Sequence, residues 1–297
     1  MPLALKIDVD TYRGLAEGAP RLAAFLRTKK IPASFFVTLG PDTSGWAATR
    51  VFRHKGFLQK MNRTSALSLY GWRTVLSGTL WPARPMAASF VDALRRWRDW
   101  GFEVSPHGFD HVRWHDDAAG WDTIRAAREW DVICAAYDHV FKEAPRSFAA
   151  PGWQAGAGTW TVMDRAGLLY HSDSRGDAPY FPKEGGAAFQ TLEVPTTLPT
   201  WDEMLAWPVA DLVAETLAQA AANRLHVWTI HAEFEGGSYF ETFQRTVAAF
   251  EQRGETWVDL RRVAEERLRE RARIPVCGFT QGVRPGRAGT VTCQALN

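Results

Sequence analysis

The stretch LALKIDVD at residues 3–10 is a short apolar run that ends in two aspartates. Its length and composition are typical of a buried strand. A second apolar run, ASFFVTL, follows at residues 33–39, and a helix-like pattern lies between the two at residues 18–29. A strand, a helix and a second strand in this order form the unit from which parallel sheets are built. The start of the chain therefore predicts an α/β protein.

The same alternation runs through most of the chain. Seven or eight strand-and-helix units fit one (β/α) barrel better than two separate domains. We therefore expect a single barrel domain over residues 1–274 and an irregular C-terminal tail over residues 275–297, where Gly, Pro, Thr and Arg occur without periodicity. The remaining strands are predicted at residues 102–107, 146–151, 169–173, 189–195, 225–231 and 256–260, and the remaining helices at residues 86–100, 119–142, 156–166, 208–222, 238–253 and 260–273.

The composition is that of an ordinary globular protein, with 46% hydrophobic and 23% charged residues. Three cysteines are too few for a disulfide framework, which favours a reducing compartment. No apolar run reaches the roughly 18 residues that a transmembrane helix needs. The first residues also lack the basic and apolar regions of a secretory signal. These features predict a cytoplasmic protein.

Residues 40–85 form an insertion between the second strand and the next helix, far longer than an ordinary connection. Residues 41–85 contain seven Lys and Arg residues against one acidic residue, mixed with Trp, Phe, Leu and Tyr. The apolar side chains could simply pack on the barrel. Basic and aromatic residues together are also typical of an amphipathic segment on an anionic membrane surface. We favour the membrane interpretation, because core packing gives no reason for the charge.

A second basic segment lies at residues 261–297, with eight Arg against three Glu, so the rest of the chain is acidic. Two basic segments on an acidic body favour an anionic partner. Nucleic acid is not the expected partner, because the acidic remainder and a carboxylate-rich barrel mouth oppose a continuous phosphate track. The sequence gives no indication of an oligomeric state.

Asp8 and Asp10 carry the first chemical signal. Residues two apart on a strand point to the same side, and the carboxyl end of a barrel strand is where active sites form. Two carboxylates at the end of a buried strand are costly unless a metal ion or another positive charge compensates them. An ordinary loop or helix-capping pair is the alternative.

His107 and His111 carry the second signal. Two imidazoles four residues apart on a helical turn share one face and can chelate one ion. His115 continues the spacing, so the sequence alone leaves open which two of the three would bind. Two histidines and one carboxylate are a common catalytic metal set with open positions for water.

His231, at the end of the strand LHVWTIH, is a candidate general acid or base because its pKa lies near neutrality. A structural histidine is the alternative. Glu233 falls on the same side and could be its partner. Gly152 and Trp153, in the segment APGW, follow another strand, and a free amide there could stabilise an oxyanion.

Asp173 and Arg175 lie in the loop SDSRGD at residues 172–177. Asp173 could orient and charge His231, as a second carboxylate often does for an imidazole. Arg175 could bind a phosphate or orient a carboxylate. The alternative is an ion pair within the loop.

The motifs IDVD, HGFDH, APGW, SDSRGD and TIH, in this order, resemble the polysaccharide deacetylase superfamily. The resemblance implies a distorted (β/α) barrel of about seven strands, with the long insertion after the second strand. It also implies a divalent metal ion that activates water to cleave an N-acyl group from a sugar; zinc is the first choice, with cobalt, nickel or manganese as alternatives. The implied roles are catalytic base for Asp8, metal ligands for Asp10, His107 and His111, catalytic acid for His231, and tuning carboxylate for Asp173.

More specific blocks resemble the deformylase branch of this superfamily: TSALSLYGWRTVLSGTLWP at residues 64–82, VPTTLPTWDEM at residues 194–204 and TIHAEFEGG at residues 229–237. This branch removes a formyl group from formamido-arabinose carried on phosphoundecaprenol, in the aminoarabinose modification of lipid A. The resemblance implies a lipid-linked sugar substrate and a peripheral position on the cytoplasmic face of the inner membrane. Tyr70, in the first block, is a candidate substrate contact.

The sequence departs from the superfamily at residues 148–151, which read FAAP where many members have an arginine that holds the catalytic aspartate ionised. Arg175 is the candidate replacement. Two other functions remain open: an N-deacetylase acting on another amino sugar, and a barrel that binds glycolipid without catalysis. The presence of all five candidate acid, base and ligand residues argues against the second.

Overall fold

The computed structural model describes residues 2–46, 77, 82–220 and 224–295. Most of the insertion predicted over residues 40–85, including Tyr70, therefore lies outside the described residues. No helix within the described part of the chain is both long enough and apolar enough to cross a bilayer.

A parallel sheet built around β1 (Pro2–Val9) forms the centre of the molecule. One edge of β1 pairs with β10 (Thr256–Val258) and then with β2 (Ser34–Val37), and the other edge pairs with β9 (His226–His231). Next to β2 lies β3 (Glu103–Pro106). The carboxyl ends of β1, β3 and β9 therefore meet at one end of the sheet.

A second parallel sheet of β4 (Ser147–Phe148), β5 (Tyr170–His171) and β8 (Leu192–Glu193) completes the ring. Single backbone hydrogen bonds join the two sheets. The Ala149 amide donates to the Pro106 carbonyl at 3.2 Å, and the Thr197 amide donates to the Val227 carbonyl at 3.2 Å. The strands thus follow one another in the order β1, β2, β3, β4, β5, β8 and β9. The predicted distorted barrel of about seven strands is confirmed.

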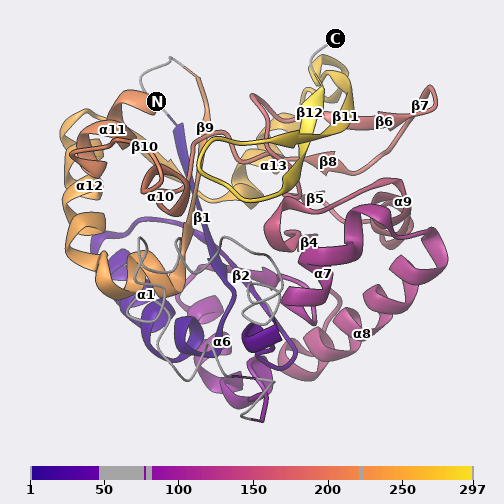
Figure 1. Ribbon diagram of the computed structural model, residues 1–297, viewed down its shortest axis with the longest axis horizontal. Helices are drawn as coiled ribbons and strands as arrows, with labels where there is room; N and C mark the ends of the chain where they lie inside the picture. The colour runs from indigo at the N-terminus through magenta and orange to yellow at the C-terminus, as the bar shows by residue number, and fades with distance from the viewer. Residues whose placement is uncertain (1, 47–76, 78–81, 221–223, 296–297) are drawn as a thin grey trace, which may run out of the picture.

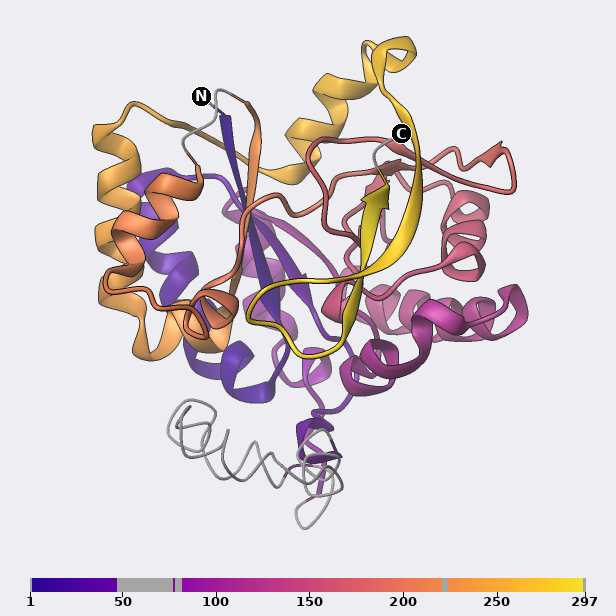
Figure 2. The same cartoon turned by 45° about the horizontal axis from the view of Figure 1, so that its top comes forward.

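Helices surround these strands (Figures 1 and 2). Two short π-helical turns, η1 (Gly14–Gly18) and η5 (Phe234–Ser238), come shortly after β1 and β9. The α-helices are α1 (Ala19–Lys29), α6 (Val91–Asp99), α7 (His111–Asp117), α8 (Thr123–Phe141), α9 (Ala157–Ala166), α10 (Trp201–Met204), α11 (Leu212–Gln219), α12 (Phe240–Gln252) and α13 (Leu260–Leu268), and the shorter turns are η1 (Gly14–Gly18), η2 (Ala87–Ser89), η3 (Ala118–Gly120), η4 (Pro151–Trp153), η5 (Phe234–Ser238) and η6 (Arg271–Arg273).

The alternation of side chains along β1 separates the core into two parts. Leu3, Leu5, Ile7 and Val9 belong to the large apolar cluster shared with the helices, whereas Ala4 belongs to a cluster with inward-facing residues of the other strands. Because strand side chains alternate, Lys6 and Asp8 lie on the same side as Ala4, inside the barrel. Both are almost completely buried.

The C-terminal tail differs from the expectation of irregular structure. It forms an antiparallel hairpin of β11 (Val276–Val283) and β12 (Thr290–Ala295), and β11 pairs with β6 (Phe181–Glu184), which in turn pairs with β7 (Ala187–Ala188). Most of the Gly, Pro and Arg residues that suggested irregular structure lie in the connecting loop, RPGRAG at residues 284–289, whereas Gly278 and Gly282 lie within β11. The residues that follow, TVTC, have the β-branched composition of a strand.

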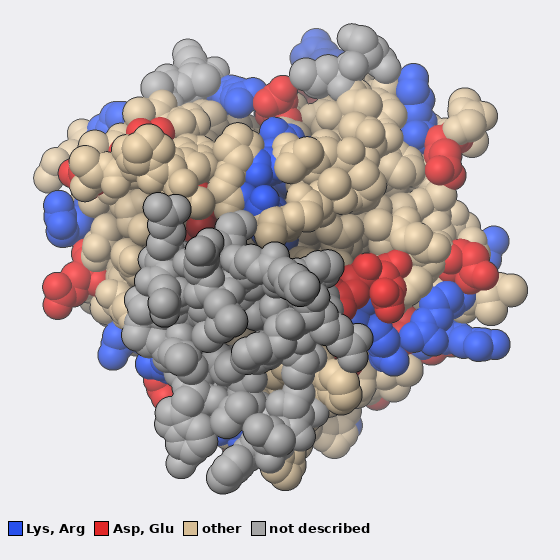
Figure 3. Space-filling view, viewed as in Figure 1, with Lys and Arg blue, Asp and Glu red and all other residues tan. Residues whose placement is uncertain are grey.

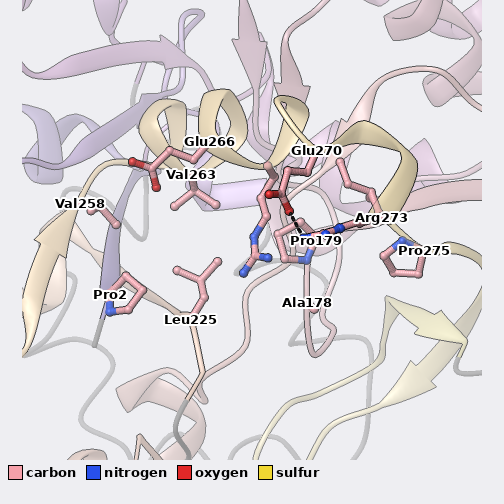
Figure 4. A pocket seen from close by; sticks show the side chains of 12 residues that line it. Pro2, Ala178, Pro179, Leu225, Val258, Val263, Glu266, Glu270, Arg273 and Pro275 are labelled. Carbon is pink, nitrogen blue, oxygen red and sulfur yellow. Dashed lines mark hydrogen bonds and ion pairs between the residues drawn. The ribbon is translucent and has the colours of Figure 1, made fainter.

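A cavity lies at the opposite end of the barrel from the carboxyl ends of the strands (Figure 4). Pro2 at the start of β1 lines it together with apolar and charged side chains of α13. Six residues of extended strand, about 20 Å, separate Pro2 from Asp8. This cavity is therefore not part of the candidate site described next.

Candidate active site

Asp10, His107 and His111 come together at the carboxyl end of the central sheet. Asp10 follows β1, His107 follows β3, and His111 is the first residue of α7, whose N-terminus is capped by the Asp110 side chain. His107 Nε2 lies 3.3 Å from Asp10 Oδ1, and His111 Nε2 lies 3.4 Å from Asp10 Oδ2. The two histidines that the sequence placed on one helical turn thus face one carboxylate.

A hydrogen bond fixes the ring of His107. Its Nδ1 lies 2.8 Å from the carbonyl oxygen of Ala149, an acceptor, so Nδ1 carries the proton and Nε2 offers a lone pair. His115, the third histidine of the spacing, has its Nδ1 3.3 Å from Asp116 and lies outside this group. The structure therefore selects His107 and His111 from the alternatives that the sequence left open.

The donor set fits a divalent cation. One ligand atom from each of Asp10, His107 and His111 lies within 4.8 Å of the others. Asp8 Oδ1 and Asp10 Oδ1 are buried, and no group in the described part of the chain makes a hydrogen bond to either oxygen. Burial opposes the charge of Asp10, but the two imidazoles outweigh it and hold the pKa of Asp10 well below its usual range. Two histidines and a carboxylate suit zinc and several other divalent ions.

Lys6 supplies the positive charge next to Asp8. Its Nζ lies 3.4 Å from Asp8 Oδ2 and donates to the Ser172 carbonyl at 3.1 Å, and its side chain is fully buried. The sequence analysis did not single out Lys6. The signal was available, because residues two apart on a strand share a side, but a lysine within an apolar run is usually read as a surface residue.

Arg175 does not replace the missing superfamily arginine at Asp8. Its Nη1 donates to Glu203 Oε1 at 2.7 Å, and its Nη2 donates to the Leu198 carbonyl at 2.9 Å. The prediction that Arg175 orients a carboxylate is correct, but that carboxylate belongs to α10. Lys6 takes the place expected for Arg175, because β1 itself carries the cation beside Asp8.

His231 lies at the end of β9 with a carboxylate beside it. Its Nδ1 is 3.5 Å from Asp202 Oδ1, and its backbone amide donates to Glu235 Oε2 at 2.8 Å. Burial lowers the pKa of His231, but Asp202, helped by Asp10 and Glu235, raises it to about 9. The imidazole is therefore protonated at neutral pH, as a general acid must be.

Asp173 is not the partner of His231, contrary to the prediction. Its Oδ1 accepts a hydrogen bond from the Ala150 amide at 2.8 Å, and its Oδ2 accepts one from Trp160 Nε1 at 3.0 Å. Asp173 follows β5, and both of its oxygens are occupied on that side of the barrel. It holds the segment that begins at Ala150, and the carboxylate beside His231 is Asp202 of α10.

His171, Asp173 and Glu193 form a second buried group with metal-like spacing. Its carboxylates already accept several donors: Glu193 Oε1 accepts the Ser174 amide at 2.9 Å and the Ser174 hydroxyl at 2.7 Å, and Glu193 Oε2 contacts His171 Nδ1. A carboxylate with these donors has few lone pairs left for a cation. We interpret this group as a structural hydrogen-bond network.

Gly152 and Trp153 form one wall of the site. Both have positive φ angles, 61° and 54°, which is unusual for a bulky residue such as tryptophan. The Trp153 amide donates to the Ala150 carbonyl at 3.1 Å, so it is not the oxyanion donor that the sequence suggested. The indole of Trp153 lies edge-on to the His231 ring, with 6.3 Å between the ring centroids.

Glu233 is buried close to the same group. Burial raises the pKa of its carboxyl well above the usual range, and the charge of Asp10 raises it further. Its Oε2 makes no hydrogen bond within the described residues. The structure brings Glu233 to the site without pairing it with His231, whose carboxylate neighbour is Asp202.

Comparison with known proteins agrees with this arrangement. The chain is 35% identical over 252 residues to a Shewanella sediminis protein named probable 4-deoxy-4-formamido-L-arabinose-phosphoundecaprenol deformylase, a match that covers 82% of this chain and 80% of the relative. A protein of the same name from Wigglesworthia glossinidia brevipalpis is 28% identical over 286 residues, which cover 95% of this chain and 98% of that protein. No family model matches the chain.

The fold has solved counterparts. A Mycobacterium smegmatis protein described as a polysaccharide deacetylase aligns with a TM-score of 0.62 at 18% identity, over 96% of this chain and 94% of that chain. At this identity the likeness concerns the fold, and it agrees with the α/β barrel described above. With the sequence relatives, it shows that the chain belongs to the family of the 4-deoxy-4-formamido-L-arabinose-phosphoundecaprenol deformylases, carbon–nitrogen hydrolases with the fold of the polysaccharide deacetylases.

Proposed function

We propose that this protein hydrolyses the formamide of 4-deoxy-4-formamido-L-arabinose-phosphoundecaprenol to formate and the free amine, a step in the aminoarabinose modification of lipid A. The names of its relatives support the substrate. The observation that carries the proposal is the grouping of Asp10, His107 and His111 at the same end of the barrel as the Lys6–Asp8 pair and His231.

The chemistry divides between a cation and the side chains around it. A divalent cation held by Asp10, His107 and His111 supplies, when bound, a water of lowered pKa and a positive charge for the carbonyl oxygen of the formamide. Zinc is our first choice, and the donor set also suits cobalt, nickel and manganese.

The side chains then handle two protons. Asp8, with Lys6 as its counter-charge, accepts a proton from the water that attacks the formyl carbon. His231, protonated beside Asp202, donates a proton to the sugar nitrogen as the carbon–nitrogen bond breaks. One water is consumed, and formate and the amine leave.

The substrate also bears on where the protein works. A sugar on a polyprenyl phosphate is confined to a membrane, and the basic, aromatic residues 41–85 have the composition of an interfacial segment. We propose a peripheral position on the cytoplasmic face of the inner membrane. If a variant lacking residues 47–76 sediments with anionic liposomes as strongly as the full chain, this part of the proposal is wrong.

The central test measures formate and amine released by the zinc-loaded protein from formamido-arabinose carried on a short prenyl phosphate. We expect formate release that a chelator abolishes and zinc restores. The acetamido analogue is assayed in parallel. Acetate release without formate release would assign the protein as a deacetylase, and no release of either product by protein with bound metal would favour a binding barrel.

A further inference from the structure

The loop between β11 and β12 is fixed at the mouth of the barrel. Gln154 Nε2 donates to the Thr290 carbonyl at 2.5 Å, and the Thr292 hydroxyl donates to the Ala155 carbonyl at 2.8 Å, so β12 is attached to the segment that follows Trp153. On its other side the loop touches α10. Gly286, with φ +82°, is so close that a Cβ there would lie 2.1 Å from the Glu203 carbonyl oxygen. The loop therefore lies between Trp153 and the helix that carries Asp202.

This loop brings Arg287 onto the wall of the site. The Arg287 guanidinium carbon lies 4.7 Å from the centroid of the Trp153 ring, and its Nη2 donates to the Gly152 carbonyl at 3.3 Å. The guanidinium carbon of Arg175 lies 4.8 Å from the same ring. The Trp153 ring also contacts His231, so one indole lies next to both the candidate acid and two arginines.

The positive charge of this group is only partly compensated. Glu203 pairs with Arg175, but within the described residues no carboxylate lies within ion-pair distance of Arg284 or Arg287. The Nε atoms of all three arginines are buried, and no acceptor from the described part of the chain reaches them. The Arg287 amide donates to the Arg284 carbonyl at 3.1 Å, so the two arginines lie on one turn of the loop. Burial lowers the pKa of Arg175, Glu203 opposes this effect, and the charges of Arg284 and Arg287 lower it further.

Figure 3 shows basic side chains between two largely uncharged areas in the upper middle of the face, where Figure 1 draws the loop between β11 and β12. Arg284 and Arg287 are both half-buried, so their guanidinium groups combine a restricted position with access to a ligand. Guanidinium groups arranged in this way favour phosphate, whose oxygens accept two parallel N–H bonds.

We propose that Arg284 and Arg287 form a subsite for the phosphate ester of the substrate, beside Trp153. The inference rests on the proposed function. In a 4-formamido sugar with an anomeric phosphate, the amide and the phosphate are at opposite ends of the ring, and the Trp153 ring lies next to both His231 and Arg287. The hairpin thus recognises the carrier phosphate and places the formamide at the cation site.

The experiment compares two soluble substrates: formamido-arabinose on a short prenyl phosphate, and the methyl glycoside of the same formamido sugar, which has no phosphate. In the double variant Arg284→Gln/Arg287→Gln we expect KM for the phosphorylated substrate to rise about tenfold or more, with KM for the methyl glycoside unchanged. The double variant Arg284→Lys/Arg287→Lys keeps the positive charges but loses the paired N–H donors of the guanidinium groups. Its KM for the phosphorylated substrate should lie between those of the wild-type protein and the glutamine variant. Arg273→Gln, which removes an exposed arginine of η6 paired with Glu270, is the matched control.

Direct binding of a non-reacting probe, a short prenyl phosphate, is measured by calorimetry on the same variants and should weaken in parallel with the rise in KM. Equal changes for both substrates, or none, would overturn the subsite. So would a loss of binding to phosphatidylglycerol vesicles with an unchanged KM, because the ligand would then be membrane phosphate. If the wild-type protein releases formate from neither substrate, the proposed function is wrong. If the wild-type protein releases formate and the double variant still prefers the phosphorylated substrate to the methyl glycoside, only the subsite is wrong.

Discussion

Lys6 is a buried cation within the candidate active site. It lies inside the barrel, with its Nζ 3.4 Å from Asp8 Oδ2. Lys6→Met would leave a buried carboxylate without its cation. We expect a fall in kcat of about a hundredfold and a loss of unfolding free energy of about 3 kcal/mol, measured by formate release and by urea denaturation.

Lys6→Arg is the control, because it keeps the cation at the same position. It should retain more activity and more stability than Lys6→Met. If the two variants lose kcat to the same extent, the role assigned to the charge of Lys6 is wrong, and only the packing of the side chain matters.

Asp202 is the carboxylate that raises the pKa of His231 most. In the proposed mechanism the acid form of His231 is the active one, so we expect activity to fall as pH rises through about 9. Removing the carboxylate in Asp202→Asn lowers the pKa of His231, and the alkaline limb of the kcat/KM profile should move to lower pH by about one unit. Asp173→Asn, which alters a carboxylate that does not reach His231, should leave the limb in place; a shift there instead would restore the role first predicted for Asp173.

At the level of elements, the strands and helices could be predicted where a short apolar run or a helical pattern lies within a single segment of the sequence. The ends of β1, β3 and β9 carry the carboxylates and histidines in sequence order, so Asp8, Asp10, His107 and His111 could be named from motifs. Lys6 was not predicted as a site residue, because its role depends on whether its side chain faces the inside or the outside of the barrel. The pairing of Asp202 with His231 joins an α10 residue to a strand end, and no local pattern reports such a contact.

The C-terminal hairpin was missed for a different reason. Its loop contains Gly286 and Gly289, both with positive φ, and such residues lower the average β-propensity of the whole segment. β12 is held by hydrogen bonds to Arg175: the Arg175 amide donates to the Thr292 carbonyl, and the Arg175 carbonyl accepts from the Gln294 amide, each at 2.8 Å. β11 is held by its pairing with β6. Tertiary contacts of this kind are decided by a partner far away in the sequence.

The turns η1 and η5, which follow Asp10 and His231 along the chain, pack closely against each other. A Cβ on Gly18 would lie 1.9 Å from the Ala232 carbonyl oxygen, just before η5, and a Cβ on Gly236 would lie 2.5 Å from the Gly18 carbonyl oxygen. Gly18→Ala should therefore separate the two turns, costing about 2 kcal/mol of stability and lowering kcat. Gly120→Ala, where a Cβ meets no heavy atom within 4 Å, should change neither quantity. Thermal unfolding measures the change in stability, and formate release measures the change in kcat. An unchanged kcat in Gly18→Ala would show that the packing of the two turns does not affect catalysis.

At the level of the whole molecule, the barrel buries the carboxylates of Asp8 and Asp10. Their negative charges destabilise the folded barrel unless positive charges compensate them. Asp8 has Lys6 beside it, whereas the oxygens of Asp10 face two imidazoles and nothing else that donates within the described residues. A cation bound there joins β1, β3 and α7 in the folded state and has no such site in the unfolded chain. Binding should therefore stabilise the whole fold.

Zinc at a hundredfold excess over its Kd should add about 2.7 kcal/mol to the unfolding free energy, visible as a rise in Tm that EDTA reverses. His107→Ala should abolish that rise.

The buried group of His171, Asp173 and Glu193 tests whether zinc binds at this site or at any group with metal-like spacing. His171→Ala should lower the Tm without zinc, because it breaks a buried network. It should keep the zinc-dependent rise, since the carboxylates of that group already accept protein donors. His139→Ala, which removes an exposed histidine of α8, should change neither value. A zinc-dependent rise that survives in His107→Ala and disappears in His171→Ala would move the metal site to the other side of the barrel.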